Sequence, residues 1–206
     1  MKSVLFITRY IKYLFTAKSK YSAQAPFLYE FITKVLNNHY NDANCKKIEQ
    51  LRKKLCKSDQ NIKITDFGAG SHINNSKNRQ VKDVAKNSAK NSKFGKLLYR
   101  IIQYYKPKNI IELGTSLGIS TLYLAKARKD TKIYTFEGCL ETAKIAEKNF
   151  SKMDAKNINL TLGDFQNTLQ KKLERICSID LAFIDGNHQE YPTIFYFEEC
   201  LKYSNN

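Results

Sequence analysis

The stretch Asn109-Ile110-Ile111-Glu112-Leu113-Gly114-Thr115-Ser116-Leu117-Gly118 decides the fold of this chain. Its first five residues are mostly apolar and predict a short strand that is buried on both faces. The two glycines predict a tight turn, and a helical pattern over residues 119–128 follows at once. A strand that passes through a glycine turn into a helix is the building unit of a parallel α/β sheet.

The same unit repeats along the rest of the chain. Further strands are predicted at residues 132–136, 158–162 and 179–184. Helices are predicted at residues 97–105, 140–150, 166–176 and 192–203. Strands that alternate with helices form a mostly parallel sheet with right-handed crossovers. The predicted fold class is therefore α/β, with four core strands covered on both faces.

Residues 1–93 differ from this pattern and predict a basic, mostly helical region. Helices are expected near residues 3–15, from Pro26 onward and near residues 45–55, and a short strand at residues 62–67. The run 71–93 is rich in Asn, Ser and Lys and reads as a polar loop, with one short helix at Val81, Val84 and Ala85. The sequence thus predicts two parts, residues 1–93 and 94–206.

Positive charge is concentrated in the first half of the chain. The 206 residues carry a net charge of +16; residues 1–108 hold 23 Lys and Arg against 6 Asp and Glu, and residues 109–206 hold 12 against 13. Such a half can bind nucleic acid or an anionic membrane surface. Yet 29 of the 35 basic residues are Lys, beside 18 Asn, and Arg is the preferred residue for phosphate and base recognition. A bias in base composition is the preferred explanation, so nucleic-acid binding is not expected.

Several features indicate a cytoplasmic protein. No stretch reaches the roughly 18–20 apolar residues of a membrane-spanning helix, and Arg9 and Lys12 interrupt the first apolar run before any signal-like cleavage site. The five cysteines form no C-x-x-C pair, which favours reduced thiols. The amphipathic helix at residues 3–15 is expected to dock on the core, with peripheral membrane contact as the alternative.

Two glycine turns compete as the ligand site. Asp66-Phe67-Gly68-Ala69-Gly70 lacks a clear second strand with an acid at its end, so it is expected to be a structural turn. The turn after Glu112 has the complete context, because Glu137 ends the next strand 23 residues beyond Gly114. In open α/β sheets such a distal acid binds both ribose hydroxyls. No glycine is placed to seat a pyrophosphate, which favours an adenosine ligand without a diphosphate.

These residues resemble the class I S-adenosylmethionine-dependent methyltransferases, and most closely the small O-methyltransferases of the catechol and caffeoyl-CoA type. The resemblance covers about residues 95–206 and includes the run Gly95-Lys96-Leu97-Leu98. It implies a Rossmann-like fold that binds S-adenosylmethionine. The family fold continues with a fifth strand and an antiparallel final pair that have no counterpart here. The chain is therefore expected to be C-terminally incomplete, with the fourth strand as an open edge.

The resemblance also implies roles for single residues. Glu112 and Gly114 would lie under the methionine part of the donor, Ser120 near its carboxylate, and Glu137 at its ribose. The turn Gly163-Asp164-Phe165 would recognise adenine. The other donor-binding positions implied are Thr115, Ser116, Gly118, Gly138 and Asp185.

Asp185-Gly186-Asn187-His188 matches the family's catalytic loop. His188 stands where catechol enzymes carry a lysine base, and a neutral imidazole can accept a hydroxyl proton. Asp185 stands where metal-dependent members place an aspartate, but their other metal ligands follow the fifth strand. A divalent metal could therefore bind at Asp185, but the sequence does not supply the other ligands of a complete metal site.

The predicted function is S-adenosylmethionine-dependent O-methylation of a small molecule. A nucleic-acid methyltransferase is the alternative enzyme; it is disfavoured because Ile184-Asp185-Gly186-Asn187 lacks the (Asp/Asn)-Pro-Pro-aromatic loop of amino-methylating enzymes. A non-catalytic binding or scaffolding module is the alternative from another class. An open edge at the fourth strand, beside a partly covered last helix, predicts a homodimer or other self-association.

Overall fold

The computed structural model describes residues 2–16, 25–38, 42–65 and 78–205. The chain divides into two compact units, Met1–His39 and Tyr40–Asn206. The first unit contains the helix α1 (Lys2–Thr16), then α2 (Pro26–Glu30), which continues into the π-helical turn η2 (Phe31–Leu36). Pro26 begins α2 because proline at a first helical position loses no hydrogen bond. Both N-terminal helices predicted from the sequence are confirmed.

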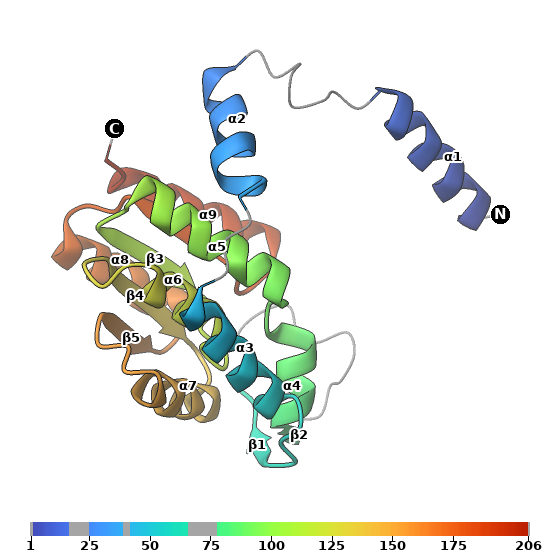
Figure 1. Ribbon diagram of the computed structural model, residues 1–206. Helices are drawn as coiled ribbons and strands as arrows, with labels where there is room; N and C mark the ends of the chain where they lie inside the picture. The colour runs from blue at the N-terminus through green and yellow to red at the C-terminus, as the bar shows by residue number, and fades with distance from the viewer. Residues whose placement is uncertain (1, 17–24, 39–41, 66–77, 206) are drawn as a thin grey trace. The chain divides into compact units, whose positions relative to one another are not determined.

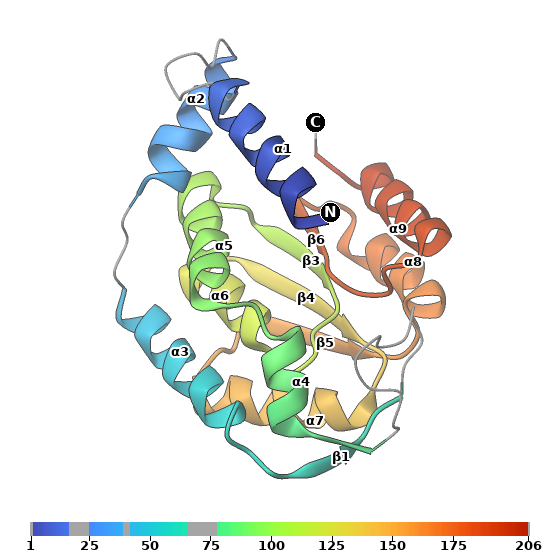
Figure 2. The ribbon, with the colours of Figure 1, turned by 90° about the vertical axis from the view of Figure 1, so that its right-hand side faces the viewer.

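The second unit is built on a four-stranded parallel sheet. Its order is β5-β4-β3-β6, and the central strand β3 pairs with β4 on one side and β6 on the other (Figure 2). The strand bounds are β3 (Asn109–Leu113), β4 (Lys132–Glu137), β5 (Ile158–Leu162) and β6 (Leu181–Ile184). In the register, Leu113 pairs with both Phe136 and Ile184, so the carboxyl ends of three strands meet at one edge.

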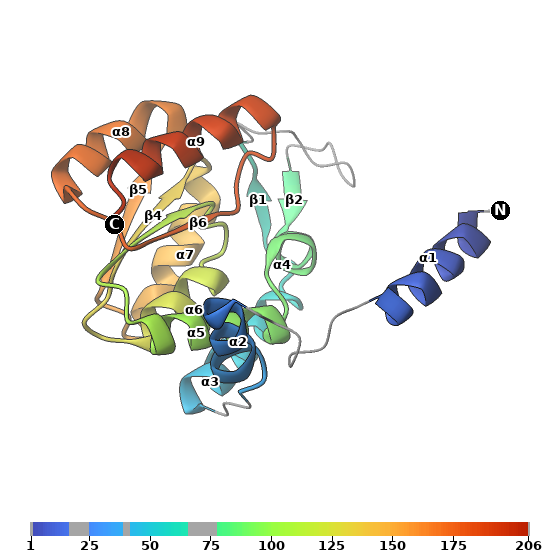
Figure 3. The ribbon, with the colours of Figure 1, turned by 90° about the horizontal axis from the view of Figure 1, so that it is seen from above.

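Helices cover both faces of this sheet, which confirms the predicted α/β class. One face carries α5 (Ser92–Tyr105), α6 (Ile119–Ala127) and α7 (Leu140–Lys152), and the other carries α8 (Phe165–Ile176) and α9 (Glu190–Lys202) (Figure 3). Successive β3 residues enter different cores because strand side chains alternate. Ile110 is buried with Leu98, Leu122 and Phe150, whereas Ile111 and Leu113 are buried with Leu169, Leu173 and Tyr196.

Between residue 40 and the sheet, the structure adds two helices and a small hairpin to the same unit (Figure 1). These are α3 (Ala43–Leu55), β1 (Asn61–Lys63), β2 (Asn78–Gln80) and α4 (Val81–Ser88). Cys45 and Ile48 of α3 are buried in the same cluster as Ile110. The compact unit therefore begins well before the boundary at residues 93 and 94 expected from composition, because a change in surface charge does not mark where apolar contacts end.

The polar run 71–93 is only partly a loop. The short helix expected at Val81, Val84 and Ala85 is confirmed as α4, but the sequence predicts no strand at Asn78–Gln80. This strand exists because it pairs antiparallel with β1, three residues against three. β1 itself ends at Lys63, earlier than predicted, and the glycine turn at residues 66–70 lies outside the described residues.

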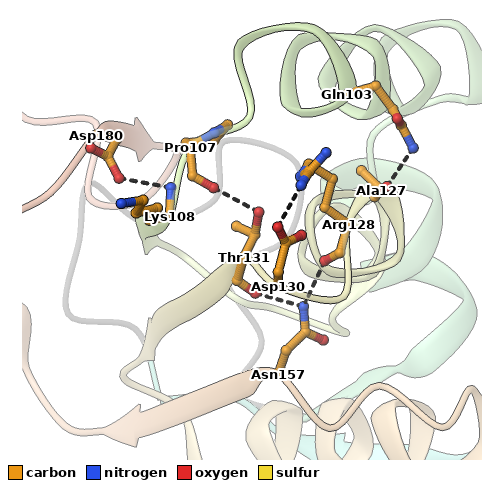
Figure 4. A network of polar contacts seen from close by, with 9 residues as sticks. All are labelled: Gln103, Pro107, Lys108, Ala127, Arg128, Asp130, Thr131, Asn157 and Asp180. Atoms are coloured by element: carbon orange, nitrogen blue, oxygen red, sulfur yellow. Dashed lines mark hydrogen bonds and ion pairs between the residues drawn. The ribbon is translucent and has the colours of Figure 1, made fainter.

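A polar network ties together the amino ends of the strands (Figure 4). The carboxylate of Asp180 accepts the backbone N–H of Lys108 at 2.7 Å, and the Thr131 hydroxyl donates to the Pro107 carbonyl at 2.6 Å. The Asn157 side chain donates to the carbonyls of Thr131 and Arg128. These contacts satisfy the loop backbone at this edge, and the candidate functional residues lie at the opposite, carboxyl edge.

Strand β6 forms one edge of the sheet, as predicted, although it begins at Leu181 rather than at residue 179. Ile179 instead forms a single parallel bridge with Ser204, after α9. On α9, Ile194, Phe197 and Leu201 are each about half exposed, in agreement with the expected partial cover of this helix. Within the described ranges, no helix is both long and apolar enough to cross a membrane.

Candidate functional site

Gly114 follows β3 and lies against the carboxyl ends of β4 and β6. It has φ +102°, and a Cβ atom at this position would lie 2.6 Å from the Asp185 carbonyl oxygen. The backbone N–H groups of Gly114 and Thr115 both donate to the Phe136 carbonyl at 3.0 Å, and the Asp185 N–H donates to the Leu113 carbonyl at 2.9 Å. The turns after β3 and β6 are thereby held against each other, which requires glycine at residue 114.

Gly114→Ala should destabilise the fold by about 3 kcal/mol, since it combines left-handed strain with overlap on a buried backbone. Gly163→Ala is the matched comparison: it also has positive φ, +136°, but its Cβ would meet only the Thr168 methyl group, at 3.1 Å. We expect a loss of about 1–2 kcal/mol there. Urea unfolding measures both values, and equal losses would show that the contact between the turns is not tight.

A buried carboxylate lies beneath this turn. Glu112 is completely buried, and its Oε2 accepts hydrogen bonds from the hydroxyls of Thr121 and Thr135. The Thr135 hydroxyl is in turn 2.6 Å from that of Thr115. The sequence pattern singles out neither Thr121 nor Thr135, because their roles depend on contacts across α6 and β4.

The second oxygen of Glu112 is unsatisfied. In the described part of the chain, Glu112 Oε1 is buried without a hydrogen-bond partner. Burial raises the pKa of the Glu112 carboxyl from 4.5 to about 7, against the opposing effect of the hydroxyls of Thr121, Thr135 and Ser120. A buried polar atom without a partner is costly, and a cationic donor beside Oε1 would relieve that cost.

Glu137 ends β4 and organises two neighbouring turns. Its Oε2 accepts the Ser116 N–H at 2.6 Å and its Oε1 accepts the Cys139 N–H at 2.9 Å. Burial raises the pKa of Glu137, and these backbone N–H groups oppose the rise. Each carboxylate oxygen can accept more than one hydrogen bond, so this carboxylate can still bind a pair of hydroxyls.

The other residues of the first turn have mainly structural contacts. Thr115 and Ser120 are buried, and the Thr115 side chain belongs to the Glu112 network rather than to an open surface. Gly118 begins α6 with φ +80° and packs tightly on Phe150. Ser116 is partly exposed, with φ +49°, and Gly138 is partly exposed beside Glu137. Donor contacts by these five residues stay predictions.

The turn after β5 lies at the same edge of the sheet. The Gly163 N–H donates to the Glu137 carbonyl at 2.9 Å, and Asp164 caps α8 by accepting the Gln166 N–H at 3.2 Å. The Phe165 ring is buried against Phe136 and Tyr196. Any ligand contact of Phe165 would therefore come from its backbone, since its side chain packs in the core.

The loop after β6 contains the two predicted catalytic residues. Asp185 lies beside Gly114, and its Oδ1 accepts a hydrogen bond from Lys90 Nζ at 2.8 Å. His188 is exposed on the same loop. Asn187, with φ +48°, donates from its amide to the Tyr196 hydroxyl at 3.1 Å and so fixes the loop on α9. The sequence pattern does not single out Lys90, because this residue lies in a polar run 95 residues before Asp185.

The described residues do not fit a divalent-metal site at Asp185. A metal ion bound to this carboxylate would lie within a few ångströms of the Lys90 ammonium, and the two cations would repel each other. No group of three His, Cys, Asp or Glu side chains gathers anywhere in the ranges that the structure describes.

Comparisons with known proteins agree with this geometry. Residues 111–206 match the model of a family described as "Methyltransferase domain". The chain is 31% identical over 113 residues to a catechol O-methyltransferase of Niastella koreensis, an alignment that covers 53% of this chain and 50% of that protein. The chain thus spans half the length of this curated relative.

Solved structures show the same fold at lower identity. The O-methyltransferase TomG of Streptomyces achromogenes, solved with SAM, superposes with a TM-score of 0.57 at 21% identity, over 86% of this chain and 66% of that one. The methyltransferase PaMTH1 of Podospora anserina, solved with SAH, has a TM-score of 0.58 at 20% identity, over 81% and 59%. Residues 111–206 are therefore similar to a methyltransferase domain, and the chain shares the fold of these solved methyltransferases.

Proposed function

We propose that this chain binds S-adenosylmethionine at the carboxyl edge of β3 and β4 and transfers its methyl group to an oxygen of a small molecule. The single observation that carries the proposal is the unsatisfied, buried Glu112 Oε1, which calls for a cationic donor such as the ammonium of the methionine part. The solved relatives are O-methyltransferases or methyltransferases with SAM or SAH bound, and the curated relative is a catechol O-methyltransferase.

The residues would divide the donor between them. Glu112 would hold the ammonium from below, and Gly114 would let the backbone approach the methionine part, with Thr115, Ser116, Gly118 and Ser120 around it. Glu137, flanked by Gly138, would accept both ribose hydroxyls. Gly163, Asp164 and the Phe165 backbone would border the adenine. When bound, S-adenosylmethionine supplies an electrophilic methyl group, and the protein's contribution is chiefly to align an acceptor oxygen with it.

Two residues of the β6 loop would act on the acceptor. His188 is exposed and can accept a proton from an acceptor hydroxyl. Asp185, next to Gly114, would border both the donor and the acceptor. In this proposal residues 94–206 hold the donor. The basic residues 1–93 are mostly helical, and residues 40–93 belong to the same compact unit as the sheet.

Calorimetric titration with S-adenosylhomocysteine tests the donor site directly. We expect saturable binding at one site per chain, and a labelled-methyl assay should show transfer to phenolic acceptors but not to RNA or DNA. If the folded chain shows no saturable binding of S-adenosylhomocysteine, the proposal is wrong. Methyl transfer to RNA or DNA would instead favour the alternative function, a nucleic-acid methyltransferase, which the positive charge of the Lys-rich half also allows.

Partners beyond the acceptor stay predictions. The half-exposed α9 residues Ile194, Phe197 and Leu201 favour self-association, and α1 has exposed apolar and basic residues suited to an anionic membrane surface. Sedimentation at several protein concentrations and flotation with anionic vesicles would check these two points.

A further inference from the structure

Lys90 and Asp185 form an ion pair at the sheet edge that also carries Glu112 and Gly114. Lys90 lies between α4 and α5, and its ammonium is 2.8 Å from Asp185 Oδ1. The exposed fraction of the side chain is 30% for Lys90 and 19% for Asp185. The ammonium also lies 5.6 Å from the centre of the Phe94 ring, on the first turn of α5. Two contacts of different kinds thus hold this cation in one place.

Phe94 itself contacts the sheet, although it stays 39% exposed. Its ring lies 6.4 Å from that of Phe183 on β6, two residues before Asp185. Asp185 is in turn held by its N–H on the Leu113 carbonyl and by the packing of its own carbonyl against Gly114. Lys90 is therefore attached to the two strands, β3 and β6, whose ends border the proposed donor site.

The ammonium has hydrogen-bonding capacity to spare. A lysine ammonium has three N–H donors, and one of them is used by Asp185. Because the Lys90 side chain is still partly exposed, the other two can reach a bound molecule. A single compact cation binds one anionic oxygen well, whereas a divalent metal binds two neighbouring oxygens of a catechol at once.

We propose that the Lys90 ammonium supplies the positive charge that binds the acceptor, a role that a divalent cation has in the metal-dependent small O-methyltransferases. The acceptor is then a phenol that is held through one oxygen. This inference rests on the proposed function. The phenol oxygen attacks the donor methyl carbon, so an O–C bond forms as the S–C bond breaks and its electron pair stays on sulfur. The hydroxyl proton leaves to His188 or to water, and Lys90 keeps its own protons while it stabilises the phenolate.

Binding of 4-nitrophenol in the presence of saturating S-adenosylhomocysteine tests this role, because its phenolate absorbs visible light. The wild-type chain should raise the phenolate fraction at a fixed pH below the pKa of the free phenol. Lys90→Met, which keeps the length of the side chain, should weaken phenolate binding by about 10- to 100-fold, since one charge-assisted hydrogen bond is lost. Lys90→Arg should restore the signal to within about threefold of the wild type because it keeps the cation.

Lys93→Met is the matched control, since Lys93 is exposed on the first turn of α5. It should bind the phenolate as the wild type does, and all four proteins should bind S-adenosylhomocysteine equally. EDTA should leave phenolate binding unchanged, Mn²⁺ titration should reveal no saturable site that strengthens it, and phenol and catechol should compete equally well.

The possible results separate the two proposals. If the wild-type chain does not bind S-adenosylhomocysteine, the donor site and this inference both fail. If it binds S-adenosylhomocysteine but not 4-nitrophenol, or if Lys90→Met binds the phenolate as well as the wild type, only the role of Lys90 is overturned. Saturable Mn²⁺ binding that strengthens phenolate binding would overturn it in favour of a metal.

Discussion

Glu137→Ala is expected to weaken S-adenosylhomocysteine binding by at least about 100-fold, because two ribose hydroxyls each lose a charged acceptor worth ~1.5–3 kcal/mol. The loss of affinity should exceed the value expected from the two ribose hydrogen bonds alone. The reason is that Glu137 also accepts the N–H groups of Ser116 and Cys139, so its removal disturbs both turns. The affinity of Glu137→Gln for S-adenosylhomocysteine should lie between those of the wild type and Glu137→Ala, because the amide keeps one acceptor oxygen. Isothermal titration calorimetry measures all three affinities.

Glu147→Ala serves as the control for this prediction. Glu147 is an exposed carboxylate on α7, the helix that follows Glu137, and its removal should leave the affinity within about twofold. Thermal unfolding would show whether Glu137→Ala remains folded. A folded Glu137→Ala protein with wild-type affinity would refute the assignment of Glu137 to the ribose.

Glu112→Gln is expected to change stability and donor binding in opposite directions. The pKa of Glu112 is raised by burial to about 7, above its ordinary value of 4.5. The protonated form is thus favoured in the folded state, and its stabilising effect is complete below pH 4.5 and is lost as the pH rises through 7. The wild-type chain should therefore lose about 3 kcal/mol between these values through this group.

Glu112→Gln removes that titration, so its free energy of unfolding should exceed that of the wild type at pH 8 and approach it at pH 5. Donor affinity should fall about 10- to 100-fold at pH 8, because a neutral amide cannot pair with an ammonium. In the wild type the affinity should rise from pH 6 to pH 8 as Glu112 ionises. Urea unfolding and calorimetry at these pH values check both effects, with Glu147→Gln as the control; parallel pH curves for Glu112→Gln and wild type would contradict the prediction.

The strands and helices of residues 94–206 could be predicted from the sequence because their signals are local. Apolar β3 can be buried only within a sheet covered on both faces, and Gly114 and Gly118 have positive φ at the turn where the pattern places them. Glu137 could be predicted for the same reason, because it ends a strand, whereas the role of Glu112 is implied by the resemblance to the methyltransferases. Parallel strand ends meet at one edge, so spacing along the chain predicts proximity in space.

Contacts between distant segments were decided only by the tertiary structure. Strand β2 is polar and exists through its pairing with β1, and α3 joins the core although composition separates it from the sheet. The orphaned oxygen of Glu112 and the ion pair of Lys90 with Asp185 depend on which side chains meet across the fold. The sequence determined which chemical groups stand at the ends of the strands. Packing decided which of them are buried, neutralised or left with hydrogen bonds to give, because burial and distance are properties of the assembled sheet and not of the spacing between residues.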